Sequence, residues 1–254
     1  IKIFFHGLSF IIVFIFLNVL TQMTKEKSIK FTFNPKIKCV NIQDSKLVFP
    51  VGKVYCVGRN YEEHAQEMGV TVDKDQPFFF SKPAQAITQL ASIPFPTQTD
   101  NLHHEVELVV FLGSACSNIS PSEARQHIFG YGVGVDLTRR DLQEAAKGAG
   151  KPWDLSKGFD HSAPISKILR KEALLLNEGS ISLKVNGQKK QSGNLSNMIW
   201  KVDELISCLS KFITLKAGDI IFTGTPSGVG RLSINDKVVA EIENVGTLSF
   251  ELIK

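Results

Sequence analysis

The sequence reads mostly as short strand-like segments, and this restricts the fold more than any other feature. Residues 29–50 and 105–112 show the alternation of apolar and polar side chains that is typical of β-strands. Four prolines keep residues 76–96 in strands and loops. Because helix-like segments are few and do not alternate regularly with strands, a doubly wound parallel sheet is disfavoured. We expect a mostly β protein of the α+β class.

Helical periodicity and capping residues predict a few helices between these strands. Residues 60–69 form one candidate, with Asn60 as its N-cap and Gly69 at its end. Residues 120–129 and 138–148 form two more. The amphipathic stretch 196–212 is predicted as a helix with these residues on one face: Met198, Ile199, Val202, Leu205, Ile206 and Leu209.

Charge and cysteine content exclude several classes of function. The 254 residues include 29 basic and 25 acidic side chains, a net charge of +4, and no long basic block. This argues against a nucleic-acid-binding protein. The four cysteines lie far apart with no CxxC pair, so a zinc cluster or a disulfide framework is disfavoured. We expect a reducing compartment, the cytoplasm.

An apolar run at the N-terminus, IFFHGLSFIIVFIFLNVL over residues 3–20, is long enough to span a bilayer. It could be a membrane anchor or a signal peptide, although no small-residue cleavage site follows it. It could also be upstream translated sequence, because Met23 is followed by a polar, Lys-rich stretch. We favour the last interpretation and expect membrane contact only if residues 1–22 are an anchor.

Three carboxylates are the strongest candidates for chemistry. In a strand, Glu105 and Glu107 would project from one face, roughly 6.5–7 Å apart at Cα. Asp136 ends another apolar run, residues 131–137. A solvent-facing edge strand would also explain the two glutamates. If the three groups converge, however, their oxygens suit Mg²⁺ or Mn²⁺.

Further polar residues could complete such a site. His64 and Glu67 are three residues apart on a predicted helix, a spacing that brings imidazole and carboxylate together. Such a pair can activate water, although His–Glu pairs are also common on surfaces. The glycine-rich stretch 224–230 could hold an anionic oxygen on its N–H groups or simply form tight turns. Four polar residues are either solvated surface or, near a metal, ligands for an anionic substrate: Lys82, Arg140, Gln143 and Lys157.

Taken together and in this order, these segments resemble the fumarylacetoacetate hydrolase family, particularly its small acylpyruvate hydrolases and oxaloacetate decarboxylases. The resemblance divides the chain into an apolar segment (1–24), short N-terminal strands (25–51) and a catalytic domain (52–254), while residues 1–22 have no family counterpart. The motifs that carry the resemblance are CVGRNYEEHAQEMG (56–69), FFFSKP (78–83), HHEVELVVFLG (103–113), GYGVGVDLTRRDLQ (130–143), GKPWDLSKGFD (150–160) and GDIIFTGTPSGVG (218–230).

The resemblance also implies a fold and roles for individual residues. The fold would be a layered β-roll with few short helices, usually in a homodimer. Glu105, Glu107 and Asp136 would bind Mg²⁺ or Mn²⁺. His64 and Glu67 would activate water, with Lys157 as a further catalytic residue. The residues implied to contact a small anionic 2-oxo acid are Lys82, Arg140, Gln143 and Thr225.

The predicted reaction is hydrolysis of the C–C bond of an acylpyruvate, giving pyruvate and a carboxylic acid. Decarboxylation of oxaloacetate is a possible second activity, since it needs the same stabilised enolate but no attacking water. One alternative is a decarboxylase or isomerase of 2-oxo dioic acids in aromatic catabolism. An alternative of another class is a catalytically silent, membrane-tethered binding protein.

Overall fold

The computed structural model describes residues 32–67, 69, 76–171 and 175–254. The predicted apolar segment, residues 1–22, lies outside these described residues. The chain divides into two units, Ile1–Lys36 and Ile37–Lys254, and every element described below belongs to the second. Among the described helices, none is both long enough and apolar enough to cross a membrane.

A six-stranded mixed sheet forms the centre of the second unit, with strands in the order β12-β9-β8-β15-β3-β4. Only the β15–β3 pair is parallel. Strand β8 is internal and every one of its residues is buried, so the interpretation of a solvent-facing edge strand is wrong. The strands are β12 (Leu169–Arg170), β9 (Ile128–Val135), β8 (Val106–Leu112), β15 (Ile220–Phe222), β3 (Val54–Val57) and β4 (Phe79–Lys82).

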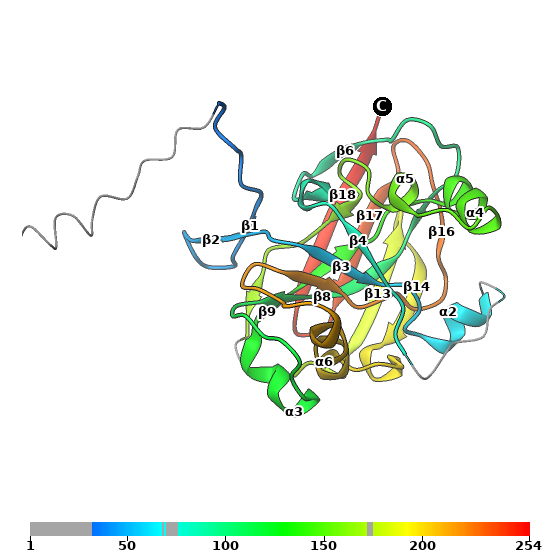
Figure 1. Ribbon diagram of the computed structural model, residues 1–254. Helices are drawn as coiled ribbons and strands as arrows, with labels where there is room; N and C mark the ends of the chain where they lie inside the picture. The colour runs from blue at the N-terminus through cyan, green and yellow to red at the C-terminus, as the bar shows by residue number, and fades with distance from the viewer. Residues whose placement is uncertain (1–31, 68, 70–75, 172–174) are drawn as a thin grey trace, which may run out of the picture. The chain divides into compact units, whose positions relative to one another are not determined.

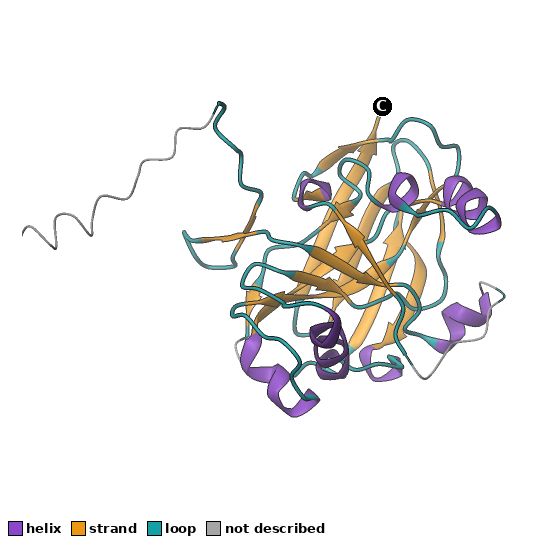
Figure 2. Cartoon of the chain, viewed as in Figure 1, coloured by secondary structure: helices purple, strands orange, loops and turns teal. Residues whose placement is uncertain are grey.

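The remaining strands form one large and three small sheets, so the predicted mostly β fold is confirmed (Figure 2). The five-stranded sheet contains β14 (Gln188–Asn194), β13 (Ser180–Val185), β17 (Lys237–Ile242), β18 (Gly246–Ile253) and β6 (Ser92–Pro94). One small sheet has three strands: β10 (Thr138–Arg139), β7 (Leu102–His104) and β16 (Gly230–Leu232). The other two have two strands each: β1 (Cys39–Asn41) with β2 (Val48–Pro50), and β11 (Ala163–Pro164) with β5 (Ile87–Thr88).

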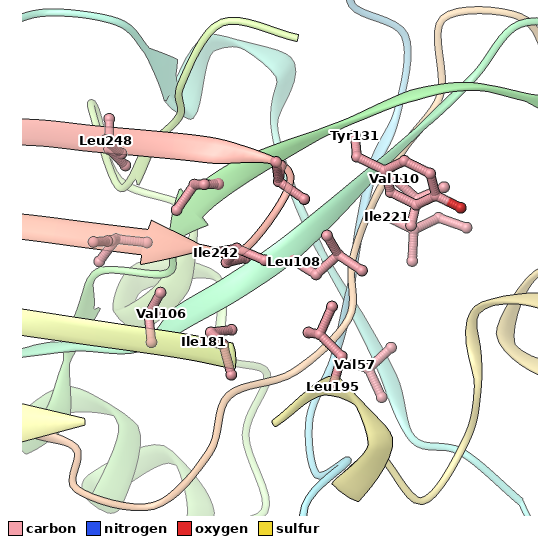
Figure 3. Packing of buried hydrophobic residues seen from close by; sticks show 14 of the residues in the cluster. Val57, Val106, Leu108, Val110, Tyr131, Ile181, Leu195, Ile221, Ile242 and Leu248 are labelled. Carbon is pink, nitrogen blue, oxygen red and sulfur yellow. The ribbon is translucent and has the colours of Figure 1, made fainter. Parts of the chain in front are cut away.

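The two larger sheets share the main hydrophobic core. Val106, Leu108 and Val110 project from one face of β8 into this core (Figure 3). Ile181 and Ile242 enter it from the five-stranded sheet. Burial of each such side chain contributes about 1.5–3 kcal/mol. The alternation predicted for this strand therefore fixes which of its residues face the larger core.

The opposite face of β8 contributes to a second, smaller core. Val109 and Phe111 pack there with Phe222 and Ile87. Glu107 lies two residues before Val109 on β8 and therefore projects from the same face, yet it has an ionisable side chain. A buried charge is costly unless it is paired or coordinates a metal, so this position requires partners.

Short helices lie around the outside of the sheets (Figure 1). The α-helices are α2 (Glu62–Glu67), α3 (Pro121–Ala124), α4 (Arg140–Gly148), α5 (Asp154–Lys157) and α6 (Val202–Phe212). The 3₁₀ helices are η1 (Ala84–Ala86), η2 (Arg125–His127) and η3 (Leu195–Asn197). The predicted helix 120–129 ends early, as α3 and η2, because Ile128 begins β9.

The prediction of one continuous helix over residues 196–212 is wrong at its beginning, and the predicted N-cap explains why. The Asn60 side chain accepts a hydrogen bond from Trp200 N (2.7 Å) and donates to Trp200 O (2.9 Å). Its amide also donates to Thr223 O (2.8 Å). These bonds occupy backbone groups that a helix would need, so α6 begins only at Val202. Asn60 thus joins distant segments, and its predicted capping role is also wrong.

Candidate metal centre and active site

Three buried carboxylates meet where β8 and β9 run side by side. Glu107 is the second residue of β8, Glu105 lies in the break between β7 and β8, and Asp136 follows β9. Asp136 N donates to Glu105 O (2.8 Å), which fixes the two ends against each other. One ligand oxygen from each carboxylate lies within 4.8 Å of the others. We call these three residues the carboxylate cluster.

Three cationic side chains surround the carboxylate cluster. Lys157 Nζ lies 2.8 Å from Glu105 Oε2 and 2.6 Å from Asp136 Oδ2. Arg140 donates to Glu105 Oε1. Lys82 Nζ lies 2.7 Å from Asp136 Oδ1, and neither side chain is exposed to solvent. Two carboxylates of the cluster are therefore paired with cations of the chain itself.

The pKa values within the carboxylate cluster diverge. Burial would raise the pKa of Glu105, but Lys157 and Arg140 hold it well below its usual range. Burial and the negative charges of Asp136 and Glu105 raise the pKa of Glu107 well above its usual range. Burial would lower the pKa of Lys157, but Asp136 and Glu105 reverse this and raise it. The chain thus stabilises charge on Glu105 and leaves Glu107 short of positive charge.

The residues present fit a divalent cation. Among the residues that the structure describes, Glu107 has no ion-pair partner, and its hydrogen bond comes from Gly224 N (2.6 Å). A cation beside it would supply the missing positive charge. Three carboxylate oxygens, without cysteine or histidine among the ligands, suit Mg²⁺ or Mn²⁺.

Two glycines allow the backbone to approach the carboxylate cluster. Gly134 pairs with Glu107 across β9 and β8, and a Cβ there would lie 2.5 Å from the Phe222 ring. Gly224 has φ +92° and lies against Asn60, where a Cβ would be 2.7 Å from the Asn60 Cβ. Larger residues at these positions would require the chain to shift.

The predicted His64–Glu67 pair forms at the edge of the site, on helix α2. His64 Nδ1 lies 3.2 Å from Glu67 Oε2, with side-chain exposures of 6% and 34%. Gly228 N donates to both oxygens of Glu67 (3.1 and 3.2 Å). We call this pair the His–Glu dyad and residues 224–230 the glycine turn. The turn holds the protein's own carboxylates, Glu107 at one end and Glu67 at the other.

The structure places the predicted substrate-binding residues around the carboxylate cluster and the glycine turn. They differ in how many contacts they already make within the protein. Gln143 accepts from Arg140, and both are buried. Thr225 is buried in the glycine turn. The Lys82 ammonium already contacts Asp136, Leu137 O, Lys157 O and Ser162, so it fixes Asp136 whatever else it does. Contact of these residues with a substrate stays a prediction.

Gln191 of β14 belongs to the site and was not predicted. Its amide nitrogen donates to Thr225 Oγ1 (2.8 Å) and Pro226 O (2.9 Å). Its amide oxygen accepts from Val106 N (3.0 Å) and lies 3.0 Å from His104 Nδ1. It therefore joins the glycine turn to the strand break that carries Glu105. Its neighbours in sequence are polar and carry no motif.

A second unpredicted contact holds Arg140. Its Nε donates to His103 Nδ1 (3.3 Å), and His103 Nε2 lies 2.9 Å from Asn101 Oδ1. Burial and the positive charge of Arg140 lower the pKa of His103 to about 4. The imidazole is therefore neutral near pH 7, as a hydrogen-bond acceptor for arginine must be.

This geometry defines a class of protein: a mostly β enzyme with buried carboxylates that could hold a divalent metal, beside a His–Glu dyad. The profile of the fumarylacetoacetate (FAA) hydrolase C-terminal family matches residues 53–253. The chain belongs to the fumarylacetoacetate hydrolase family, so the predicted family is confirmed.

Three relatives show how close the similarity is. An oxaloacetate tautomerase of Escherichia coli (strain K12) is 41% identical over 206 residues, which cover 80% of this chain and 94% of the relative. A fumarylpyruvate hydrolase of a Ralstonia species is 40% identical over 72% of this chain and 96% of its own. The crystal structure of a Pseudomonas aeruginosa fumarylpyruvate hydrolase with Mn²⁺ and pyruvate superposes with a TM-score of 0.86, at 39% identity, over 88% of this chain and 99% of that one.

Proposed function

We propose that this protein is a metal-dependent hydrolase that cleaves acylpyruvates to pyruvate and a carboxylic acid. The observation that carries the proposal is the glycine turn, which holds Glu107 of the carboxylate cluster and Glu67 of the dyad. A metal site and a water-activating pair are thereby fixed against each other. The similarity to fumarylpyruvate hydrolases supports the same chemistry.

The carboxylate cluster would hold the metal, and nearby cations would bind the pyruvyl end of the substrate. A bound Mg²⁺ or Mn²⁺ supplies Lewis-acid polarisation of the 2-oxo group. Lys157 keeps its ammonium charged, because the pKa of its amine is raised, and stabilises negative charge that develops on the 2-oxo oxygen. Arg140 and Gln143 orient the 1-carboxylate, and Thr225 donates a hydrogen bond from the glycine turn.

The His–Glu dyad would supply the nucleophile. Glu67 holds the imidazole of His64 through Nδ1, which leaves Nε2 to accept a proton from water. The hydroxide equivalent attacks the distal C4 carbonyl, and the C3–C4 bond breaks. Its electrons remain on the pyruvyl fragment, beside Lys157, until C3 takes up a proton.

A substrate panel tests this proposal. The protein loaded with Mn²⁺ is offered acetylpyruvate, fumarylpyruvate and oxaloacetate, and pyruvate release is followed with lactate dehydrogenase. We expect both acylpyruvates to be cleaved with measurable kcat. If pyruvate appears from neither acylpyruvate, the hydrolase proposal is wrong.

Keto–enol interconversion of oxaloacetate is the second candidate, favoured by the similarity to the Escherichia coli tautomerase. That reaction moves a proton at C3 and needs no attacking water. Enol-specific absorbance, measured with and without the protein before any pyruvate forms, separates it from decarboxylation. Interconversion faster than acylpyruvate cleavage would make the tautomerase the main activity.

We further propose that the catalytic domain spans residues 52–254, preceded by the segments 1–24 and 25–51, and that the protein works as a cytoplasmic homodimer. The family match over residues 53–253 supports the first boundary. The exposed rings of Phe78 and Phe212 line an open apolar groove of about 430 Å³, which suits a protein partner. The four free cysteines suit a reducing compartment. Light scattering and cell fractionation test the last two points.

A further inference from the structure

Helix α4 carries a third polar side chain on the face that bears Arg140 and Gln143. Lys147 lies seven residues after Arg140 and four after Gln143 in the sequence, a spacing that stacks side chains on one helix face. Arg140 and Gln143 are buried beside Glu105, whereas Lys147 is exposed, near the C-terminal end of α4. The face therefore runs from the carboxylate cluster towards solvent.

An aromatic pair connects Lys147 with Lys157. Lys147 Nζ lies 5.2 Å from the centroid of the Trp153 ring, and Trp153 lies 5.7 Å from the Phe80 ring. Lys157 Nζ in turn lies 5.0 Å from the Phe80 centroid. The contact over the Trp153 ring restrains a long side chain that would otherwise be free in water.

The same aromatic side chains form part of the lining of a cavity, and one of them, Phe80, also contacts Lys157. Its volume is about 600 Å³, within the range of small-molecule sites. The lining includes Phe80 and Trp153 together with two lysines and an aspartate: Lys147, Lys151 and Asp154. A ligand group that extends past Phe80 would therefore meet Lys147.

The charges around Lys147 favour an anion there. Lys82, Arg140 and Lys157 pair with Glu105 and Asp136, and a divalent cation would compensate Glu107. Arg59 and Lys147 add two more positive charges, and neither has an ion-pair partner among the described residues. Burial, then the positive charges of Arg140 and Arg59, lower the pKa of Lys147. The lining of the cavity holds two lysines, Lys147 and Lys151, against one carboxylate, Asp154. Such an excess of positive charge favours a negative ligand.

We propose that Lys147 binds a second carboxylate at the acyl end of the substrate, so that the enzyme prefers acylpyruvates that are dianions. This inference rests on the proposed hydrolase function and makes it more specific. The first carboxylate binds at the metal end of the site. The acyl chain passes the Phe80 and Trp153 rings, and its terminal carboxylate pairs with the Lys147 ammonium. Lys147 is thus a specificity-determining residue that takes no part in bond breaking.

The test compares two substrates and three variants of the Mn²⁺-loaded protein. Fumarylpyruvate carries a carboxylate on its acyl end and acetylpyruvate does not, so the ratio of their kcat/KM values reports recognition of that group. In Lys147→Gln we expect this ratio to fall about tenfold or more, mainly through the KM of fumarylpyruvate, as for a lost charged hydrogen bond. Lys147→Arg should keep most of the ratio. Lys237→Gln, with the same charge change at an exposed position of β17, should leave the ratio as it is.

The outcomes separate this inference from the function on which it rests. If the wild-type protein cleaves both acylpyruvates and Lys147→Gln leaves their ratio unchanged, the inference alone is wrong. A wild-type ratio that favours acetylpyruvate would also overturn it. If the wild-type protein cleaves neither compound, the proposed function fails and the inference fails with it. A fall in the ratio confined to Lys147→Gln supports both.

Discussion

The carboxylate cluster and the His–Glu dyad lie in one site but are built in opposite ways. The cluster lies on or directly beside internal strands of the central sheet, and each of its members is at most 5% exposed. Glu105 and Asp136 are both tied to Lys157. The dyad belongs to the short helix α2, with a single 3.2 Å contact between its members and Glu67 34% exposed.

In the proposed function, this difference would separate metal binding from proton transfer. Groups that hold a metal must keep their positions in every step, and a rigid sheet with paired charges provides this. A general base needs only one well-placed nitrogen and some freedom to exchange protons with water. Damage to the cluster should therefore abolish binding, whereas damage to the dyad should slow chemistry only.

Changes to the carboxylate cluster should have the largest effects. Asp136→Asn removes one ligand charge and leaves Lys82 and Lys157 short of a partner, so we expect loss of Mn²⁺ binding and at least a thousandfold loss of hydrolysis. It should also destabilise the fold by about 3–5 kcal/mol, the usual cost of breaking a buried ion pair. Electron paramagnetic resonance of Mn²⁺ and urea unfolding measure these effects. Glu241→Gln, at an exposed position of β17, is the control; tight Mn²⁺ binding by Asp136→Asn would contradict the assignment.

Removing the metal should stop catalysis without damage to the chain. After EDTA treatment and dialysis we expect no pyruvate release from acylpyruvates, and full activity when Mg²⁺ or Mn²⁺ is returned. The metal should also raise the melting temperature, because it binds only the folded cluster. Unchanged turnover in EDTA would show that the cluster has no catalytic metal.

The dyad should give a smaller and more selective loss. In His64→Ala we expect acylpyruvate hydrolysis to fall about a hundredfold, as for loss of a general base, with Mn²⁺ affinity retained. Decarboxylation of oxaloacetate needs no attacking water and should fall less. Glu67→Gln keeps a hydrogen-bond acceptor for the imidazole, so its rate of acylpyruvate hydrolysis should fall less than that of His64→Ala. Equal losses of both reactions would remove the proposed division between dyad and cluster.

Gln191 lies between the two regions and should show an intermediate effect. Gln191→Leu leaves Val106 N, and the groups in the glycine turn that Gln191 contacts, without a partner, which should cost about 1–3 kcal/mol of stability. If Gln191 also positions Thr225, the KM for acylpyruvates should rise with little change in kcat. Gln188→Leu, exposed on the same strand, is the matched control. A loss of stability with an unchanged KM would limit Gln191 to a structural role.

The smallest effect concerns Asp141, on the helix that carries Arg140. Burial opposes ionisation, but hydrogen bonds from Thr99 and from the backbone of Asp100 and Leu142 lower the pKa of Asp141. Because its folded pKa lies below the unfolded value of about 3.9, its contribution is present above that pH and disappears as pH falls through the folded pKa. Asp141→Asn should cost at most about 1 kcal/mol at pH 7. Its unfolding free energy should vary less with pH in acid than that of the wild type; identical pH profiles would exclude this contribution.

The local pattern of apolar and polar residues predicted those parts of the fold that are determined within a single strand. The alternation around Val106 and Leu108 predicted that these two side chains face the core. A charge at the end of an apolar run made Asp136 a candidate ligand. The pattern failed where a distant residue decides the local structure. Asn60 takes the backbone bonds around Trp200, and no sequence signal links positions 140 residues apart. Gln191 was missed for the same reason, since its partners are 34 to 87 residues away.

The parallel pairing of β3 with β15 has a consequence for how the protein is made. Val54 pairs with Ile220, so this part of the sheet cannot form until β15 has been synthesised, more than 160 residues after Val54. The glycine turn follows β15 directly and therefore leaves the ribosome well after all three carboxylates of the cluster. At elongation rates of about 5–20 residues per second, the carboxylates wait several seconds for the segment that holds Glu107 in place. The nascent chain should acquire its affinity for metal only after the glycine turn has been synthesised, and a chain stalled before residue 218 should have none.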